Sequence, residues 1–433
     1  MGELTNTPDT ARSAVQASAS PLAEAAARKI ETTCCVAGGG PAGMMAGFLL
    51  ARAGVNVIVL EKHGDFLRDF RGDTIHPSTL EVMHELGLID EFLKRPHQEV
   101  RQLSAQVGGE MVTLGDFTHL PTHCKFLAFM PQWEFLNFLA EQGARYAAFR
   151  VMMRAEVTDL IREDGRVAGV CAKTPDGPLE IRARLTIGAD GRHSTVRERA
   201  GLEVLTFGAP MDVLWMRINR RAGDPGQTFG HVDRGRFFIA LNRDEYWQCA
   251  FVIAKGSFAE TQARGIAAFR EEIAALSPWL RDRVAELRDW KDISLLTVAV
   301  DRLKRWHVPG LLCIGDAAHA MSPVGGVGIN LAIQDAVATA NILGEKLARG
   351  TLTEADLAAV QSRRRFPTRA TQRLQVFIQN RVIRRVLGST QPASLPWPLK
   401  LLARWPYLRR FPARIVGMGF RPEHVRAARK ING

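Results

Sequence analysis

The sequence predicts an α/β fold, in which a Rossmann-like nucleotide-binding domain is interleaved with a β-sheet domain and followed by a helical C-terminal segment. Residues 32–61 have the pattern of a strand, a glycine turn, a helix and a second strand, which is the shortest route to a parallel strand pair. Strand-rich patterns follow at 150–188 and 213–253, and a second strand, glycine loop and helix occupy 311–350. Elements of one nucleotide-binding domain are therefore expected to be separated by strands of another domain.

Length and composition set few limits on this fold. A chain of 433 residues can form two domains that share a large core. No stretch approaches the roughly 18–20 apolar residues of a membrane span. Residues 1–30 lack the basic start and apolar centre of a secretory signal, so we expect a flexible leader and a cytoplasmic protein. The six Cys lack the paired spacing of a zinc site, and no metal is predicted.

The first strand leads into a glycine-rich turn. Gly38, Gly40 and Gly43 match G-x-G-x-x-G, with Pro41 and Ala42 inside the motif. In such a motif the glycines provide a tight turn, close approach of the backbone to a pyrophosphate, and close packing of helix on strand. Glu61 follows Gly40 by 21 positions, just before Lys62, and its carboxylate is placed to accept hydrogen bonds from ribose hydroxyls. This unit alone predicts a dinucleotide and leaves NAD and FAD open.

Two later segments favour FAD. Asp190 and Gly191 lie in TIGADGRHSTVR, and Gly315 and Asp316 lie in CIGDAAHAMSPVGGVGIN. Asp316 is predicted to end a buried strand, where its carboxylate can bind a ribityl hydroxyl. The loop after it is poor in large side chains, so a flat ring can approach, and the helix that begins near Gly328, Ile329 and Asn330 directs its positive end at that ring.

Together the three segments resemble those of the class A FAD-dependent monooxygenases, the para-hydroxybenzoate hydroxylase-like aromatic hydroxylases that include ubiquinone-biosynthesis hydroxylases. The resemblance spans about residues 31–360 and implies an FAD-binding domain of the glutathione reductase type. It also implies that NADH or NADPH serves as a transient electron donor, since no second G-x-G-x-x-G is present. The implied reaction uses O2 to hydroxylate or epoxidise an aromatic, quinone-like or polyketide-like small molecule through a flavin C4a-hydroperoxide.

The resemblance also implies roles for individual residues. Gly328, Ile329 and Asn330 would lie against the flavin pyrimidine, and Asp190 would help to position the pyrophosphate. Further cofactor contacts are implied for Arg71, near the phosphates or ribityl chain, for Gln132, and for the backbone of Val157 at the adenine.

Catalytic side chains are harder to predict, because the flavin carries the chemistry. His76 and Pro323 are the candidates closest to the expected ring. Trp215, Arg217, Phe238 and Trp247 are predicted to line an aromatic substrate pocket, although aromatic side chains on strands are also typical of a core.

The predicted domains follow from these assignments. Residues 31–103, 130–206 and 298–362 form the FAD-binding domain, and residues 104–129 and 207–297 form the substrate domain. The segment 363–433 is strongly basic, and two interpretations stay open for it. Its helices either cover the flavin domain with solvated arginines, or lie on an anionic bilayer at the inner membrane face. No nucleic acid partner is predicted, and the chain is expected to be a monomer or a homodimer.

Two other functions remain as alternatives at this stage. One is an FAD-dependent reductase or dehydrogenase of a lipophilic substrate, which would consume no oxygen. The other is a non-enzymatic flavin-binding protein. A halogenase is disfavoured because the W-x-W-x-I-P signature is absent.

Overall fold

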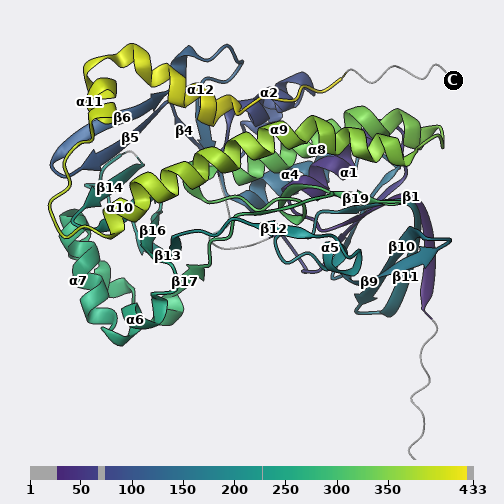
Figure 1. Cartoon of the computed structure of the whole chain (residues 1–433), viewed down its shortest axis with the longest axis horizontal. Helices are drawn as coiled ribbons and strands as arrows, with labels where there is room; N and C mark the ends of the chain where they lie inside the picture. The colour runs from purple at the N-terminus through teal and green to yellow at the C-terminus, as the bar shows by residue number, and fades with distance from the viewer. Residues whose placement is uncertain (1–26, 67–73, 227, 427–433) are drawn as a thin grey trace, which may run out of the picture.

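The computed structural model describes residues 27–66, 74–226 and 228–426 (Figure 1). Its largest sheet contains five parallel strands in the order β20, β11, β1, β2 and β8, and β19 pairs antiparallel with β20 at one edge. The last four residues of β1 are all buried, as expected for a strand covered on both faces. The bounds are β1 Arg28–Ala37, β2 Val57–Glu61, β8 Phe149–Met153, β11 Gly177–Gly188, β19 His307–Val308 and β20 Leu311–Cys313.

Helices α1, α4 and α8 pack together on this sheet (Figure 1). Gly47 lets α1 approach closely, since a Cβ there would lie 2.6 Å from Val59 Cγ2. The first half of β11 also pairs antiparallel with β10, which pairs with β9. The bounds are α1 Pro41–Arg52, α4 Gln132–Gly143, α8 Gly328–Ala348, β9 Glu156–Glu163, β10 Arg166–Thr174 and the short α5 Thr195–Arg199.

A second sheet has seven strands in the order β17, β13, β16, β15, β14, β5 and β6. All neighbours are antiparallel except β14 and β5, so residues 102–116 join a sheet otherwise built from 211–296. One face packs on α6 and α7, and the other faces α10 and the loop before α8. The bounds are β5 Gln102–Val107, β6 Glu110–Asp116, β13 Met211–Asn219, β14 Phe229–Asp233, β15 Arg236–Asn242, β16 Tyr246–Ala254, β17 Ile293–Leu296, α6 Phe258–Ala263 and α7 Ile266–Leu276.

Smaller elements connect the two sheets. Strands β3, β7 and β4 form a three-stranded sheet beside α2, and β12 pairs with β18. The bounds are β3 Thr74–Ile75, β4 Gln98–Val100, β7 Leu127–Phe129, β12 Val204–Thr206, β18 Asp301–Leu303, α2 Pro77–Glu85 and α3 Ile89–Phe92.

The C-terminal helices begin with α9 (Glu354–Ile378), which lies along α8 (Figure 1). The predicted boundary at residue 363 is wrong as a structural break, because it falls inside this continuous helix. A π-helical turn (Gln379–Ile383), α10 (Arg384–Leu387), α11 (Trp397–Arg404) and α12 (Arg410–Met418) follow. The predicted leader 1–30 overlaps β1 by three residues, and residues 1–26 lie outside the described chain.

The predicted fold class is confirmed: an FAD-domain architecture interleaved with a β-sheet domain and followed by helices. The exact domain boundaries stay predictions. Within the described residues, no helix is both long and apolar enough to cross a membrane.

Candidate functional site

The predicted cofactor motifs meet at the carboxyl ends of the parallel strands. Backbone hydrogen bonds join these ends: Gly38 N–H donates to Leu60 O (2.8 Å), Ala189 N–H to Ala37 O (2.8 Å) and Ile314 N–H to Gly188 O (2.9 Å). In open α/β sheets, ligands bind in the crevice outside this edge. The structure therefore brings together three motifs that are separated by more than a hundred residues each.

The glycine turn has the shape that a pyrophosphate requires. Gly38 has a φ of +106°, and a Cβ there would lie 2.4 Å from Ala189 O; at Gly43 it would lie 1.9 Å from Gly38 O. At Gly40, the N-cap of α1, a Cβ would meet no atom within 4 Å. Pro41 and Ala42 form the first turn of α1, whose N–H groups lack intrahelical partners and favour an anion. The first and third glycines serve packing, whereas Gly40 borders open space.

Glu61 closes β2 beside this turn. Its Oε2 accepts a hydrogen bond from Gly39 N–H and its Oε1 accepts one from His63 N–H, both 3.0 Å. A carboxylate has about four acceptor positions, and these two bonds orient it beside the turn. Lys62 is exposed on the next turn. Val157 lies in β9 opposite Ala172, and its predicted contact with adenine stays a prediction.

Asp190 follows the end of β11 by two residues and bonds to the first turn of α5, whose N-cap is Ser194. Its Oδ2 accepts from Val196 N–H at 3.1 Å, and its Oδ1 accepts from the Ser194 hydroxyl. Burial raises the pKa of Asp190 and outweighs these hydrogen bonds, which lower it. The carboxylate thus shapes the turn, while at Gly191, with a φ of +87°, a Cβ would meet open space. The predicted pyrophosphate role of Asp190 stays a prediction.

Gly315 and Asp316 follow β20. Gly315 has a φ of +59°, and a Cβ there would lie 2.8 Å from Ala42 Cβ, so glycine is needed where α1 approaches. The Asp316 carboxylate is about one-third exposed and lies 3.8 Å from the Arg192 guanidinium. The predicted contact of Asp316 with a ribityl hydroxyl stays a prediction.

The loop between β20 and α8 is held by side chains from elsewhere. From α9, Gln375 Nε2 donates to the carbonyls of Ser322 and Val324, both at 2.9 Å. Asn330, in the first turn of α8, accepts from His76 N–H at 2.8 Å and donates to Thr74 O at 2.9 Å. The start of α8, including Gly328 and Ile329, is therefore fixed before any ring binds.

A buried chain of charges supports the same loop. Asp335 of α8 accepts from Gly315 N–H (3.1 Å), from His319 Nε2 (2.5 Å) and from Arg364 Nε (2.8 Å). Arg364 also reaches Glu423. Burial alone would raise the pKa of Asp335, but His319 and Arg364 hold it below its ordinary value. The network ties the loop between β20 and α8 to α9 and to the C-terminal segment. We call this loop, residues 314–327, the flavin loop after the predicted position of the ring.

Sequence reasoning missed the supporting residues of α9. A signal was present, because polar residues recur on one face of α9 at a helical spacing. Such a face indicates a polar stripe that bonds to backbone groups of a neighbouring loop. The buried members are Arg364, Thr368, Thr371, Gln372, Gln375 and, just beyond α9, Gln379.

The two predicted catalytic candidates are His76, which lies beside the loop between β20 and α8, and Pro323, which lies within that loop. His76 is buried at the start of α2, with Nδ1 2.6 Å from Val416 O. Burial lowers the pKa of His76 to about 4, against the opposite effect of the carbonyls of Val416, Gly326 and Gly325. The ring is therefore neutral at pH 7 and a weak base. Pro323 is the N-cap of the 3-10 turn Val324–Gly326.

Two predicted cofactor residues remain, Gln132 and Arg71. Gln132 begins α4 and is half-buried. Arg71 lies outside the described residues.

The predicted substrate residues divide between the two faces of the large antiparallel sheet. Trp215 packs in the same apolar cluster as Val324 of the flavin loop. Arg217 lies two residues further along β13 and stacks 4.1 Å from the Tyr246 ring. Because side chains two apart share a face of a strand, Trp215 and Arg217 both lie on the side that faces Val324.

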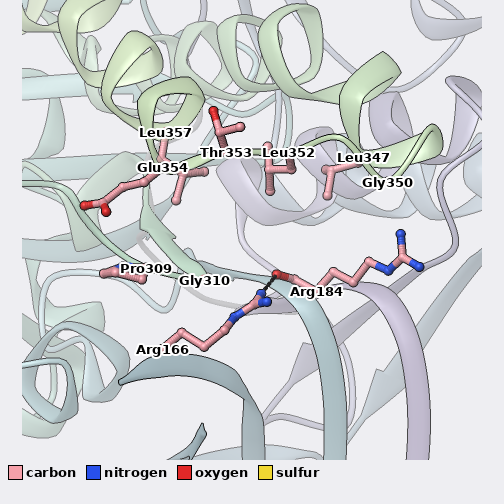
Figure 2. Close-up of a pocket in the computed structure, with 10 residues that line it drawn as sticks. All are labelled: Arg166, Arg184, Pro309, Gly310, Leu347, Gly350, Leu352, Thr353, Glu354 and Leu357. Carbon is pink, nitrogen blue, oxygen red and sulfur yellow. Dashed lines mark hydrogen bonds between the residues drawn. The ribbon is translucent and has the colours of Figure 1, made fainter. Parts of the chain in front are cut away.

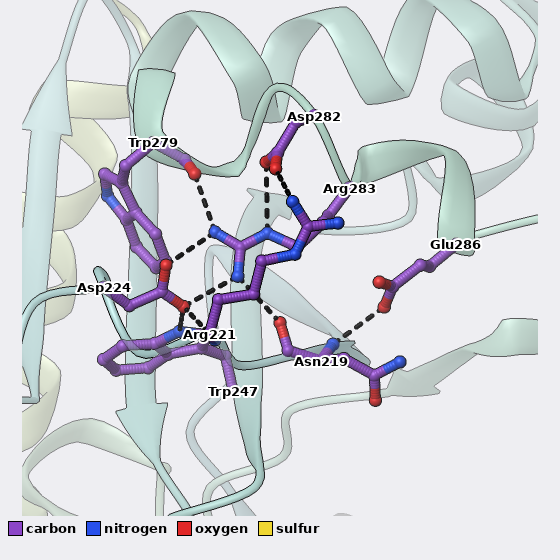
Figure 3. Close-up of polar contacts among 8 residues, drawn as sticks. All are labelled: Asn219, Arg221, Asp224, Trp247, Trp279, Asp282, Arg283 and Glu286. Carbon is purple, nitrogen blue, oxygen red and sulfur yellow. Dashed lines mark hydrogen bonds and ion pairs between the residues drawn. The ribbon is translucent and has the colours of Figure 1, made fainter.

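Phe238 and Trp247 are corrections to the predicted pocket. Both are fully buried in the core between the sheet and α7, on the opposite face. Trp247 Nε1 donates to Asp224 Oδ2 at 2.8 Å, and Asp224 forms a buried ion pair with Arg283 (Figure 3). Alternation along a strand shows which side chains share a face. It does not show which face of the sheet packs on α7 and which one faces the loop before α8.

A separate cavity of about 460 Å³ lies where the α8–α9 connection meets the start of β20 (Figure 2). Gly310 immediately precedes β20, so this cavity is at the amino ends of the strands and away from the cofactor motifs. Arg166 spans it, donating to Arg184 O at 2.7 Å. The other lining residues are Pro309, Leu347, Gly350, Leu352, Thr353, Glu354 and Leu357.

Comparison with known proteins adds independent findings. A family model described as FAD binding domain matches residues 31–374. The 6-methylpretetramide 4-monooxygenase of Streptomyces rimosus is 34% identical over 89% of this chain and 92% of its own length. A rifampicin monooxygenase of Streptomyces venezuelae is 31% identical over 70% of this chain and 61% of its own.

Solved structures agree on the fold. The p-nitrophenol 4-monooxygenase of Pseudomonas putida superimposes with a TM-score of 0.72 at 18% identity, covering 89% of this chain and 97% of that one. The anhydrotetracycline hydroxylase of Streptomyces rimosus superimposes with a TM-score of 0.68 at 22% identity, covering 90% and 76%.

Proposed function

The chain belongs to the FAD binding domain family, among the class A flavin-dependent aromatic hydroxylases, and from this premise we propose that it uses NADH or NADPH to oxygenate a polyketide-like aromatic substrate. The reaction is the insertion of one oxygen atom of O2 by hydroxylation or epoxidation. The names of the relatives that act on 6-methylpretetramide and anhydrotetracycline support this substrate class.

The observation that carries the proposal is the junction between the flavin loop and the large antiparallel sheet. Val324 of the loop packs with Trp215 of β13 and Ile239 of β15. A flat substrate on this face of the sheet would lie beside the loop that the flavin ring requires. The apolar neighbours favour burial of an aromatic ring system and exclude water from it.

Bound FAD would supply the redox chemistry, and the chain's own residues supply position and charge. The open space at Gly40 accommodates a pyrophosphate, and Glu61 and Asp316 offer carboxylates to the ribose and ribityl hydroxyls. The start of α8 directs backbone N–H groups and a positive partial charge toward the ring. His76, neutral at pH 7, adds no competing positive charge there.

Polar groups on the same sheet face support a substrate that carries oxygen atoms. Gln248 of β16 is buried, and its Oε1 accepts from Arg243 Nε at 3.2 Å. Among the described residues, neither Gln248 Nε2 nor Trp215 Nε1 has a hydrogen-bond acceptor. An unsatisfied buried donor costs about 1–3 kcal/mol, which a carbonyl or hydroxyl oxygen of a substrate would offset.

An oxygen electrode tests the proposal directly. Flavin-loaded protein is mixed with NADH or NADPH and a panel of polycyclic phenols, quinones and aromatic polyketides. We expect one substrate to stimulate oxidation of the nicotinamide together with oxygen uptake, and to gain one oxygen atom by mass spectrometry. Nicotinamide oxidation with a reduced product and no oxygen uptake would instead identify a reductase. If no compound is turned over, the monooxygenase proposal fails.

A further inference from the structure

Six large exposed apolar side chains lie on α11, on α12 and on the 3-10 turn Pro406–Arg409 that contacts both helices, and we call this group the 397–415 surface. It consists of large side chains whose exposed fractions range from 37% at Leu401 to 72% at Trp397. Single exposed apolar residues are ordinary, whereas a contiguous group indicates an interaction site. The members are Trp397, Leu401, Trp405, Tyr407, Phe411 and Ile415.

The opposite faces of the same helices hold this surface in place. Leu399 of α11 packs with Val112 of β6, and Ala413 of α12 packs with Phe117 and Leu120. Figure 1 shows α11 and α12 at the outer end of the molecule, next to β5 and β6. The packed faces account for the attachment of the helices to the protein, and leave the 397–415 surface directed outward.

Cations are interleaved with the apolar side chains. Residues 397–422 include six Lys and Arg and no Asp or Glu. Arg409 is occupied, donating to Leu402 O at 2.9 Å and Ala403 O at 3.1 Å. Within the described part of the chain, no carboxylate lies within 4.0 Å of the other exposed cations on these helices, which are Lys400, Arg404, Arg410 and Arg414.

We propose that the 397–415 surface docks the protein on an anionic lipid bilayer. Each helix presents apolar residues four apart with cations beside them: Trp397 and Leu401 on α11, Phe411 and Ile415 on α12. Helices of this kind lie in the plane of the membrane interface, where Trp and Tyr are favoured and Lys and Arg meet anionic headgroups.

The charge distribution favours a bilayer over a second copy of the chain. A two-fold interface would set the same surface against itself, so the four exposed cations of one copy would face those of the other without an acidic counterpart. Like charges placed together oppose association. An anionic bilayer complements both the apolar and the cationic residues.

The position of α12 links this surface to the cofactor site. Val416, next to Ile415, accepts from the His76 ring at 2.6 Å, and His76 lies beside the Gly325–Gly326 loop. A lipophilic compound dissolved in the bilayer would therefore meet the protein close to the flavin loop. The docking proposal itself does not depend on which reaction the protein catalyses.

Vesicle co-sedimentation tests the proposal with the full-length, flavin-loaded chain. The vesicles contain phosphatidylcholine with or without phosphatidylglycerol. We expect binding to the anionic vesicles to exceed binding to neutral ones by about tenfold or more, and to weaken at high salt. The double variant Trp405→Ser with Phe411→Ser should lose about tenfold in binding to anionic vesicles.

Matched variants separate docking from general hydrophobicity. Phe366→Ser with Phe377→Ser removes two equally exposed rings of α9 and should bind vesicles like the wild type. All variants should keep the wild-type melting temperature and flavin content. Equal binding by the Trp405/Phe411 variant and the wild type would overturn the proposal. An absence of binding to anionic vesicles would also overturn the proposal. So would a wild-type dimer in light scattering that the Trp405/Phe411 variant does not form, since the surface would then be a dimer interface.

Discussion

Replacing Gly40 with alanine separates cofactor binding from folding. Gly40 has φ −75° and ψ −177°, which alanine adopts easily, and a Cβ there meets no protein atom within 4 Å. We therefore expect the cofactor-free protein to be as stable as the wild type or more stable by about 0.4–1 kcal/mol. If the open space holds the pyrophosphate, the added methyl group should cost about 1–3 kcal/mol of binding. This corresponds to a loss of roughly 5- to 150-fold in FAD affinity.

Two assays and two matched glycine variants complete the experiment. FAD affinity is measured by quenching of flavin fluorescence, and stability by urea unfolding of the cofactor-free protein. Gly109→Ala, in the β5–β6 turn where a Cβ also meets no atom within 4 Å, should leave FAD affinity unchanged and change stability no more than Gly40→Ala does. Gly43→Ala, whose Cβ would lie 1.9 Å from Gly38 O, should lower stability. Wild-type FAD affinity in Gly40→Ala would refute the assignment of this space to the cofactor.

Three further predictions follow from the buried polar contacts. Asp335→Asn leaves Arg364 buried without its closest carboxylate and should cost about 3–5 kcal/mol in urea unfolding; a loss below about 1 kcal/mol would contradict the network. Burial opposes ionisation of Asp224, but hydrogen bonds led by that from Arg283 lower its pKa to about 2. Since the ordinary pKa is near 4, this carboxylate contributes about 2–3 kcal/mol above pH 4, lost as the pH falls toward 2. The stability gap between the wild type and Asp224→Asn should shrink over that range, and a gap that is constant with pH would exclude this reasoning. Gln248→Leu should raise KM for an oxygenated substrate about fivefold with FAD affinity unchanged, and an unchanged KM would remove Gln248 from substrate recognition.

The sequence predicted the fold and the cofactor motifs well because both depend on local patterns. The glycine spacing at 38–43 and the strand ends at Glu61 and Asp190 reflect backbone geometry that few residues satisfy. The structure places these ends on β2 and β11, which lie on either side of β1 and its glycine turn, and the family resemblance is confirmed by the match over residues 31–374. The individual cofactor contacts stay predictions.

Sequence patterns did not predict which side chains meet when that depends on tertiary packing. Alternation along β16 shows that Trp247 and Gln248 face opposite sides, but both faces of this sheet are covered. Trp247 lies on the helix side, where it donates to Asp224 of the buried Asp224–Arg283 ion pair, and these three residues are 23 to 59 positions apart in sequence. In the same way, the sequence contains the polar face of α9, but it does not specify that α9 lies along α8, where this face bonds to the loop between β20 and α8.

The discontinuity of the cofactor domain has a consequence for the growing polypeptide on the ribosome. β1 cannot acquire its neighbour β11 until about 150 further residues have emerged, and β20 follows more than 120 residues later. Arg364 has both of its carboxylate partners, Asp335 and Glu423, only after residue 423 has been synthesised. We therefore expect flavin capture to come late in biosynthesis, because the strands that carry the cofactor motifs assemble only after β20 has emerged.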